Sequence, residues 1–142
     1  MDANQVSTLW QNIKQQEKQG KPRQRLDEIK HGPALDQAEQ IQKNAAQIGF
    51  DFANVEDAFA KVDEEIAEFR QAIAQHNSDE MMAEFGDCLF SLINVGRKLN
   101  LSGEMALLST IYKFKSRFAY IEQQALAQHK AIEDMSLSEM DA

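Results

Sequence analysis

The stretch MMAEFGDCLFSLINVGRKLN, residues 81–100, decides the fold because it has the composition of a helix that packs inside a protein. Its only charged residues between Met81 and Gly96 are Glu84 and Asp87. Apolar residues occupy almost every side of this helix, which is typical of a central helix or of one shared between subunits. The two carboxylates, placed one turn apart in such a segment, are therefore candidates for a function.

Amphipathic helices are expected on both sides of this stretch, because apolar residues recur there at helical spacing. Short breaks separate these segments, which favours an all-α, antiparallel helical bundle of about five helices. The expected helices cover residues 4–19, 34–48, 55–75, 79–99 and 104–130. Asn54 and either Asn77 or Ser78 are the expected N-caps, and Gly49 is expected to end the helix at 34–48.

The 142 residues are expected to form one domain, large enough for a core without disulfides. Within it, residues 1–33 are an N-terminal helix and a basic connection, residues 34–130 are the helical core, and residues 131–142 are a tail that begins one more helix. Cys88 stands alone, so no intrachain disulfide is expected. No run approaches the roughly 20 apolar residues of a membrane span, and the polar N-terminus lacks a signal peptide, so we expect a cytoplasmic protein.

A formal net charge of −8 argues against a nucleic acid partner, because nucleic acid phosphates need a basic surface. A small polyanion would need either local Lys and Arg residues or a metal ion held by the protein's own carboxylates. The basic residues of the connection are either a solvated loop or a phosphate contact. They are Lys21, Arg23, Arg25 and Lys30.

Two pairs of acids on consecutive helices could hold such a metal ion. Glu65 and Glu68 in the stretch EEIAE share one helix face, and Glu84 and Asp87 repeat the same spacing on the next helix. Four converging carboxylates would repel one another, whereas Mg²⁺ prefers oxygen ligands and would hold them together. The alternative is that each pair is a solvated face, or that the acids only favour the positive end of a helix dipole.

Three stretches together resemble one family of enzymes. They are KVDEEIAEF at residues 61–69, EFGDCLFSLINVGRKLN at 84–100 and KFKSRFAYIE at 113–122. Their combined pattern is similar to the MazG family of nucleoside triphosphate pyrophosphohydrolases, within the all-α NTP pyrophosphatase superfamily. The resemblance is to the C-terminal catalytic half of the two-domain bacterial proteins, and it extends over nearly the whole chain. Phe52 departs from the pattern, since Trp is frequent there in the family.

This resemblance implies Mg²⁺-dependent hydrolysis of an NTP or dNTP to a nucleoside monophosphate and pyrophosphate, with Mn²⁺ as a substitute for Mg²⁺. It also implies a homo-oligomer, either a dimer or a tetramer. The implied catalytic and metal-binding residues are Glu65, Glu68, Glu84 and Asp87. The implied substrate-binding residues are Lys61, Asn94, Arg97, Lys113 and Arg117.

Several alternatives stay open at this level. The chain could be a non-enzymatic helical interaction module, or a narrower dNTP or phosphoribosyl-ATP pyrophosphohydrolase. Either Glu64 or Glu65 could act as the general base. Lys113 and Arg117 share a helix face and could hold pyrophosphate, or they could be two exposed cations.

Overall fold

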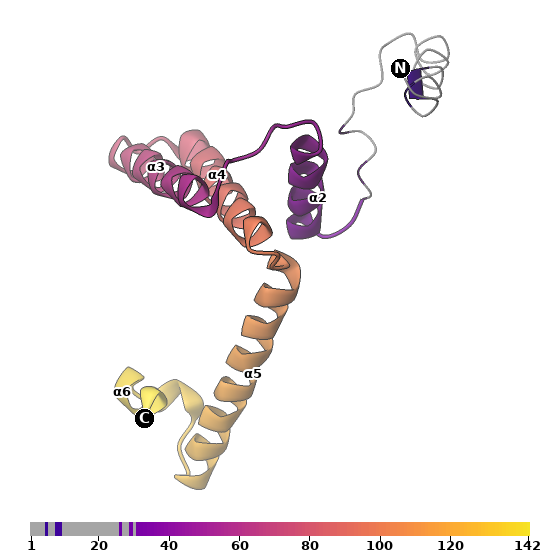
Figure 1. The fold of residues 1–142 in the computed structure, drawn as a ribbon. Coiled ribbons are helices and arrows are strands. Elements are labelled where there is room, and N and C mark those ends of the chain that lie inside the picture. The colour runs from indigo at the N-terminus through magenta and orange to yellow at the C-terminus, as the bar shows by residue number, and fades with distance from the viewer. Residues whose placement is uncertain (1–4, 6–7, 10–25, 27–28, 30) are drawn as a thin grey trace.

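The computed structural model describes residues 5, 8–9, 26, 29 and 31–142, and every regular element among them is a helix (Figure 1). The all-α class expected from the sequence is confirmed. The helix expected at residues 4–19 and the basic connection that follows it lie largely outside the described residues. The elements are α2 (Ala34–Ala46), α3 (Val55–Ala74), α4 (Ser78–Lys98), α5 (Gly103–Ala127), the 3₁₀ helix η2 (Ile132–Asp134) and α6 (Leu137–Asp141).

The helices begin close to where the sequence predicted. Asn54 caps α3 by accepting a hydrogen bond from the Asp57 N–H at 2.9 Å, and Asn77 caps α4 through the Glu80 N–H at 3.2 Å. The expected N-caps are thus confirmed, with Asn77 rather than Ser78 in that role. The α2 helix ends two residues earlier than expected, and Gly49 adopts φ +91° in the turn that follows.

Antiparallel helices α3 and α4 form the main packed unit of the structure (Figure 1). The rings of Phe69 and Phe85 stack across this helical hairpin with their centroids 5.6 Å apart. The buried core near the open end of the hairpin is small. It consists of Ala58, Val62 and Val95, with Phe52 and Val55 packed against them. Helix α2 packs against α4, where Gln42 Nε2 donates to the Phe90 carbonyl at 2.9 Å.

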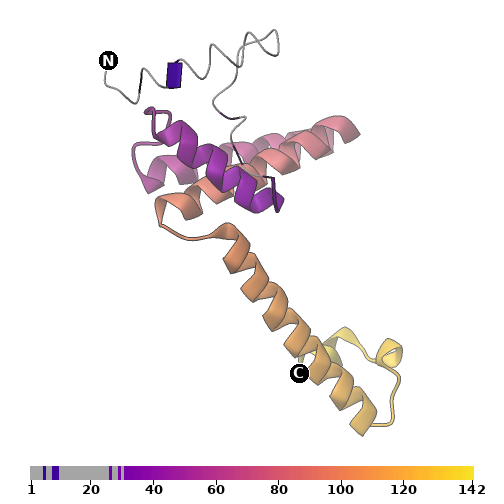
Figure 2. The same cartoon turned by 90° about the vertical axis from the view of Figure 1, so that its right-hand side faces the viewer.

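Helix α5 leaves this unit and extends away from it, as both ribbon views show (Figure 2). Gly103 allows the close approach at its start, because a Cβ there would clash with the Ile93 side chain. The chain then folds back, and α6 lies beside the distal part of α5, where Arg117 pairs with Asp141 at 2.9 Å. The arrangement is therefore more open than a closed five-helix bundle. Over the part of the chain that is described, no helix combines the length and apolarity needed to cross a membrane.

Candidate metal centre

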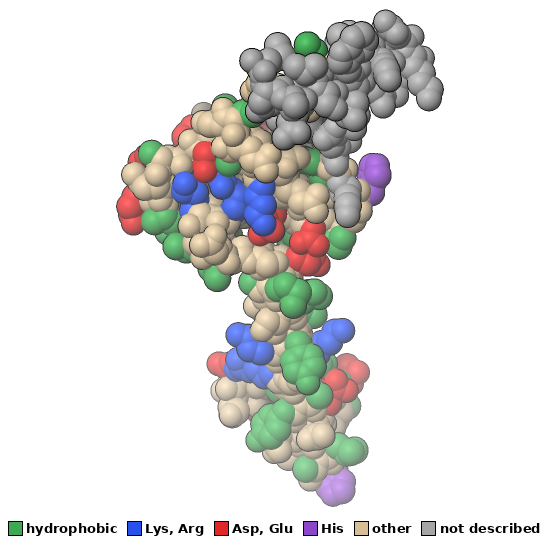
Figure 3. Space-filling model, turned by 45° about the vertical axis from the view of Figure 1, so that its right-hand side comes forward, with side chains coloured by type: hydrophobic (Ala, Val, Ile, Leu, Met, Phe, Trp, Pro, Cys, Tyr) green, Lys and Arg blue, Asp and Glu red, His purple; other side chains and the backbone are tan. Residues whose placement is uncertain are grey.

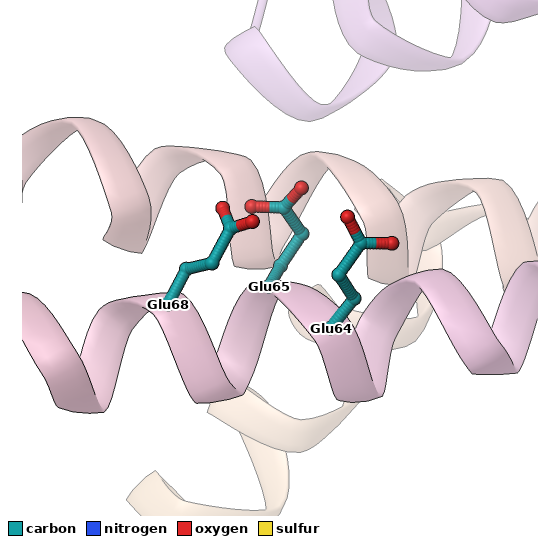
Figure 4. Close-up of side chains that lie close together, drawn as sticks. All are labelled: Glu64, Glu65 and Glu68. Atoms are coloured by element: carbon teal, nitrogen blue, oxygen red, sulfur yellow. The ribbon is translucent and has the colours of Figure 1, made fainter.

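Three glutamates lie side by side on one face of α3. Glu64, Glu65 and Glu68 each offer one carboxylate oxygen, and these oxygens lie within 4.8 Å of one another (Figure 4). Residues three and four apart share a helix face, which explains why Glu68 lies beside the other two. Helix α3 thus presents a compact anionic group.

Helix α4 adds two more carboxylates to this group. Oxygens of Glu84 and Asp87 lie within 4.8 Å of an oxygen of Glu65. Glu65 consequently belongs to both sets, so the acids of the two helices form one cluster around its side chain. Around Glu65, the structure brings together the four acids that the sequence singled out, and Glu64, the alternative general base, lies beside them.

Two oxygens in the cluster are buried without a hydrogen-bond partner. They are Glu65 Oε2 and Glu84 Oε2, and the Glu65 residue is only 6% exposed. A buried carboxylate oxygen without a donor or cation is energetically costly. Burial and the surrounding carboxylates raise the pKa of the neighbouring Cys88 thiol, which keeps that sulfur protonated. The donors are therefore carboxylate oxygens, and this set could hold a hard divalent cation.

Lys61 borders the cluster, one turn before Glu65. Its Nζ lies 2.9 Å from Glu65 Oε1 and 3.4 Å from Glu64 Oε1. The hydrogen bond from Lys61 lowers the pKa of Glu65 in spite of burial, and the same contact raises the pKa of Lys61. Lys61 thus supplies positive charge on one side of the cluster, while Glu84 forms no ion pair with a Lys or Arg among the described residues.

The pKa of the Glu84 carboxyl is strongly raised. Burial, then the charge of Glu68, and then the contact with Glu65 raise the pKa of Glu84 to about 7. Because its folded pKa exceeds the ordinary value of 4.5, its contribution to stability is complete below pH 4.5 and is lost as the pH rises through 7.

In EDTA, we expect the melting temperature of the protein to fall between pH 5 and pH 8, and we expect Glu84→Gln to remove most of that fall. Melting curves followed by circular dichroism across this range would show it, and an equal fall in both proteins would contradict it.

Asn94 and Arg97 lie further along α4, toward its C-terminal end. Arg97 donates to Asn94 Oδ1 from Nε at 3.1 Å and from Nη2 at 2.9 Å, and it forms an ion pair with Asp51. Lys98 also reaches Asp51, at 3.3 Å. The contact of Arg97 with Asp51 lowers the pKa of Asp51. Sequence reasoning did not single out Asp51, because no local pattern links it to a residue 46 positions away.

Lys113 and Arg117 lie on α5, which touches α4 only near their junction and then leaves the hairpin (Figure 2). Arg117 pairs with Asp141 instead, and both side chains are exposed. The structure does not bring this basic pair to the carboxylate cluster of its own chain.

The fold and the site together define an all-α protein whose paired carboxylates could hold a metal ion. Residues 53–120, which include all the acids of the cluster, match the family model of the MazG nucleotide pyrophosphohydrolase domain. Through this domain the chain belongs to the MazG family.

Several bacterial proteins are similar to the chain over most of its length. A nucleoside triphosphate pyrophosphohydrolase/pyrophosphatase MazG of Thermotoga maritima is 38% identical over 93% of this chain and 51% of its own length. A nucleoside triphosphate pyrophosphohydrolase of Escherichia coli K12 is 32% identical over 99% of this chain and 55% of its own length. An uncharacterized protein, YabN, of Bacillus subtilis is 42% identical over 99% of this chain and 29% of its own length. The chain thus spans about half the length of the first two relatives, and less of the third.

Proposed function

We propose that this chain hydrolyses nucleoside triphosphates to nucleoside monophosphates and pyrophosphate with Mg²⁺ bound at the carboxylate cluster. The proposal rests on two sets of three acids that share Glu65, and on two buried carboxylate oxygens that have no hydrogen-bond partner. This cluster lies within the MazG nucleotide pyrophosphohydrolase domain. Two relatives that align with nearly the whole chain are named as enzymes of this activity.

The reaction needs residues that hold the metal ion and a residue that accepts the proton of the attacking water. Glu65, Glu68, Glu84 and Asp87 would hold Mg²⁺, and the bound ion would neutralise charge on the phosphates and lower the pKa of the attacking water. A water oxygen then bonds to the α-phosphorus, and the bond from that phosphorus to the oxygen bridging the α- and β-phosphates breaks. Glu64 is better suited than Glu65 to receive the water's proton. Its side chain is exposed, whereas Glu65 is buried and its pKa is lowered by Lys61.

We further propose that the protein acts as a homodimer joined through α5. An apolar stripe on α5 is exposed along the protruding arm, where Figure 3 shows hydrophobic side chains on the surface. The stripe consists of Leu107, Ile111, Phe114 and Phe118, of which Phe114 is 68% exposed. Monomeric proteins rarely leave such a contiguous apolar surface in water. A second copy offers the same stripe and can cover it in a symmetric interface.

Dimerisation would also account for the position of the basic pair. Lys113 and Arg117 are four residues apart, on the face of α5 that adjoins the apolar stripe. A partner packed on that stripe would place these cations at the edge of the interface. We propose that Lys113 and Arg117 of the partner subunit contact the phosphates held at the carboxylate cluster.

The proposed activity is tested by incubating the protein with each NTP and dNTP. With Mg²⁺ we expect pyrophosphate rather than orthophosphate as the product, and ¹⁸O from labelled water in the monophosphate. EDTA should abolish the release of pyrophosphate, and Mg²⁺ should raise the melting temperature. An interaction module without catalysis would show neither turnover nor a Mg²⁺-dependent shift. Absence of pyrophosphate release from every nucleotide, with Mg²⁺ and with Mn²⁺, would contradict the proposal.

A further inference from the structure

Lys61 makes its shortest ionic contact with the acid that both sets of candidate ligands share. Its Nζ lies 2.9 Å from Glu65 Oε1 and 3.4 Å from Glu64 Oε1. The Glu65 side chain is buried, whereas that of Glu64 is 57% exposed. An ion pair on an open surface contributes little, but a donor to a buried carboxylate is costly to lose. The contact of Lys61 with Glu65 is therefore the one with structural consequences.

The two oxygens of the Glu65 carboxylate have different surroundings. Oε1 pairs with Lys61 Nζ, while Oε2 is buried without a hydrogen-bond partner. Glu84 Oε2, on α4, is likewise buried without a partner. Because Lys61 engages Oε1, Oε2 is the oxygen of Glu65 that is left for a hard cation between α3 and α4. The carboxylate between Glu64 and Glu68 in Figure 4 thus has one oxygen held and one oxygen open.

The charge of Lys61 opposes a cation at this cluster, whereas its position favours one. An ammonium group a few ångströms from a bound divalent ion repels that ion. The same ammonium group fixes the plane of the Glu65 carboxylate, because a donor on one oxygen restricts rotation of the whole group. Groups that orient metal ligands in this way raise the affinity for the metal, and their loss typically lowers it about 10- to 100-fold. The two effects of Lys61 therefore have opposite signs.

We infer that Lys61 is a positioning residue of the metal centre, which holds the Glu65 carboxylate so that Oε2 is directed at the bound cation. The inference rests on the proposed function, which supplies Mg²⁺. Lys61 acts through Glu65 and does not contact the ion. This role is separate from the phosphate contact that the family resemblance implies for the same side chain. Lys61 is 39% exposed and its ammonium group has three donors, so the two roles are compatible.

Two variants of Lys61 separate orientation from charge. Lys61→Met and Lys61→Gln both lose the positive charge, but only glutamine keeps a donor for Glu65 Oε1. Isothermal titration calorimetry with Mg²⁺, on the nucleotide-free protein, measures the affinity directly. Lys61→Met should bind Mg²⁺ about tenfold more weakly than the wild type, against the direction that charge alone predicts. Lys61→Gln should bind it at least as tightly as the wild type, since the donor remains and the repulsion is removed.

Lys43→Met is the matched control for the loss of a helical ion pair. Lys43 pairs with Glu39 on α2 at 3.4 Å, with the same spacing of four residues as Lys61 and Glu65. This change should leave the affinity for Mg²⁺ unaltered. Lys61→Ala, which also lacks a donor and keeps a strong helix-forming residue, should repeat the loss seen with Lys61→Met. Circular dichroism in EDTA would verify that each variant is folded.

The sign of the effect decides the outcome. Unchanged or tighter Mg²⁺ binding by folded Lys61→Met and Lys61→Ala would overturn the inference. An equal loss in Lys61→Met and Lys61→Gln would overturn it as well, because the effect would then follow the charge and not the donor. A protein that shows the expected pattern of Mg²⁺ affinities but releases no pyrophosphate from any NTP would overturn the proposed function and leave the role of Lys61 in place.

Discussion

Replacing Asp87 by asparagine is expected to lower kcat/KM for NTP hydrolysis by about a thousandfold, and Glu84→Gln is expected to do the same. Each change removes one anionic oxygen from the group centred on Glu65. A neutral amide binds Mg²⁺ more weakly than a carboxylate does, so the affinity for the ion should fall in parallel. Steady-state kinetics over a range of Mg²⁺ concentrations would measure both effects.

These variants should fold normally, which makes the loss of activity interpretable. Removing one negative charge relieves repulsion in the metal-free cluster, so the melting temperature in EDTA should stay level or rise. Asp79→Asn is the matched control, because Asp79 lies in the first turn of the same helix and undergoes the same change of charge. Near-normal turnover in both cluster variants would rule out the proposed roles of Glu84 and Asp87.

Local patterns in the sequence were sufficient to predict helices α2 to α5 and the convergence of the four acids. The spacing of Glu65 and Glu68, and of Glu84 and Asp87, places each pair on one helix face wherever those helices lie. Only a short turn joins α3 to α4, so the two helices pack side by side and their acids meet. The caps at Asn54 and Asn77 were predictable for the same reason, because each depends on residues three positions apart.

Contacts between distant segments were not predictable in this way. Gln42 reaches Phe90 across 48 residues, and Asp51 reaches Arg97 across 46, and neither pair leaves a periodic trace in the sequence. The direction of α5 is a similar case. Helical spacing places Leu107, Ile111, Phe114 and Phe118 on one face of α5, but spacing cannot say whether the same chain or another covers that face. In the structure α5 extends away from the α3–α4 hairpin, so this face is exposed and the basic pair lies apart from the acids.

Because the basic pair and the acids of one chain lie apart, we expect a second large effect: activity should return in dimers built from two different inactive chains. Asp87→Asn disables the acids of one chain, and the double change Lys113→Ala and Arg117→Ala disables the cations of another. If each site takes its acids from one subunit and its cations from the other, a mixed dimer contains one intact site. Purified mixed dimers, obtained by co-expression with two different tags, should then regain about half of the wild-type activity. Each parent dimer should remain nearly inactive.

A site built within one chain gives the opposite result, because every site in the mixed dimer would then carry one of the two defects. The mixed dimer of Asp87→Asn with Glu84→Gln is the control, since both of its chains lack an intact acid cluster and no arrangement restores one. The shared-site arrangement predicts activity in the first mixture and none in this control. If both mixtures form dimers of normal stability and both stay inactive, the cations of the partner subunit do not serve the carboxylate cluster. The apolar stripe on α5 would then be an interface without a catalytic role.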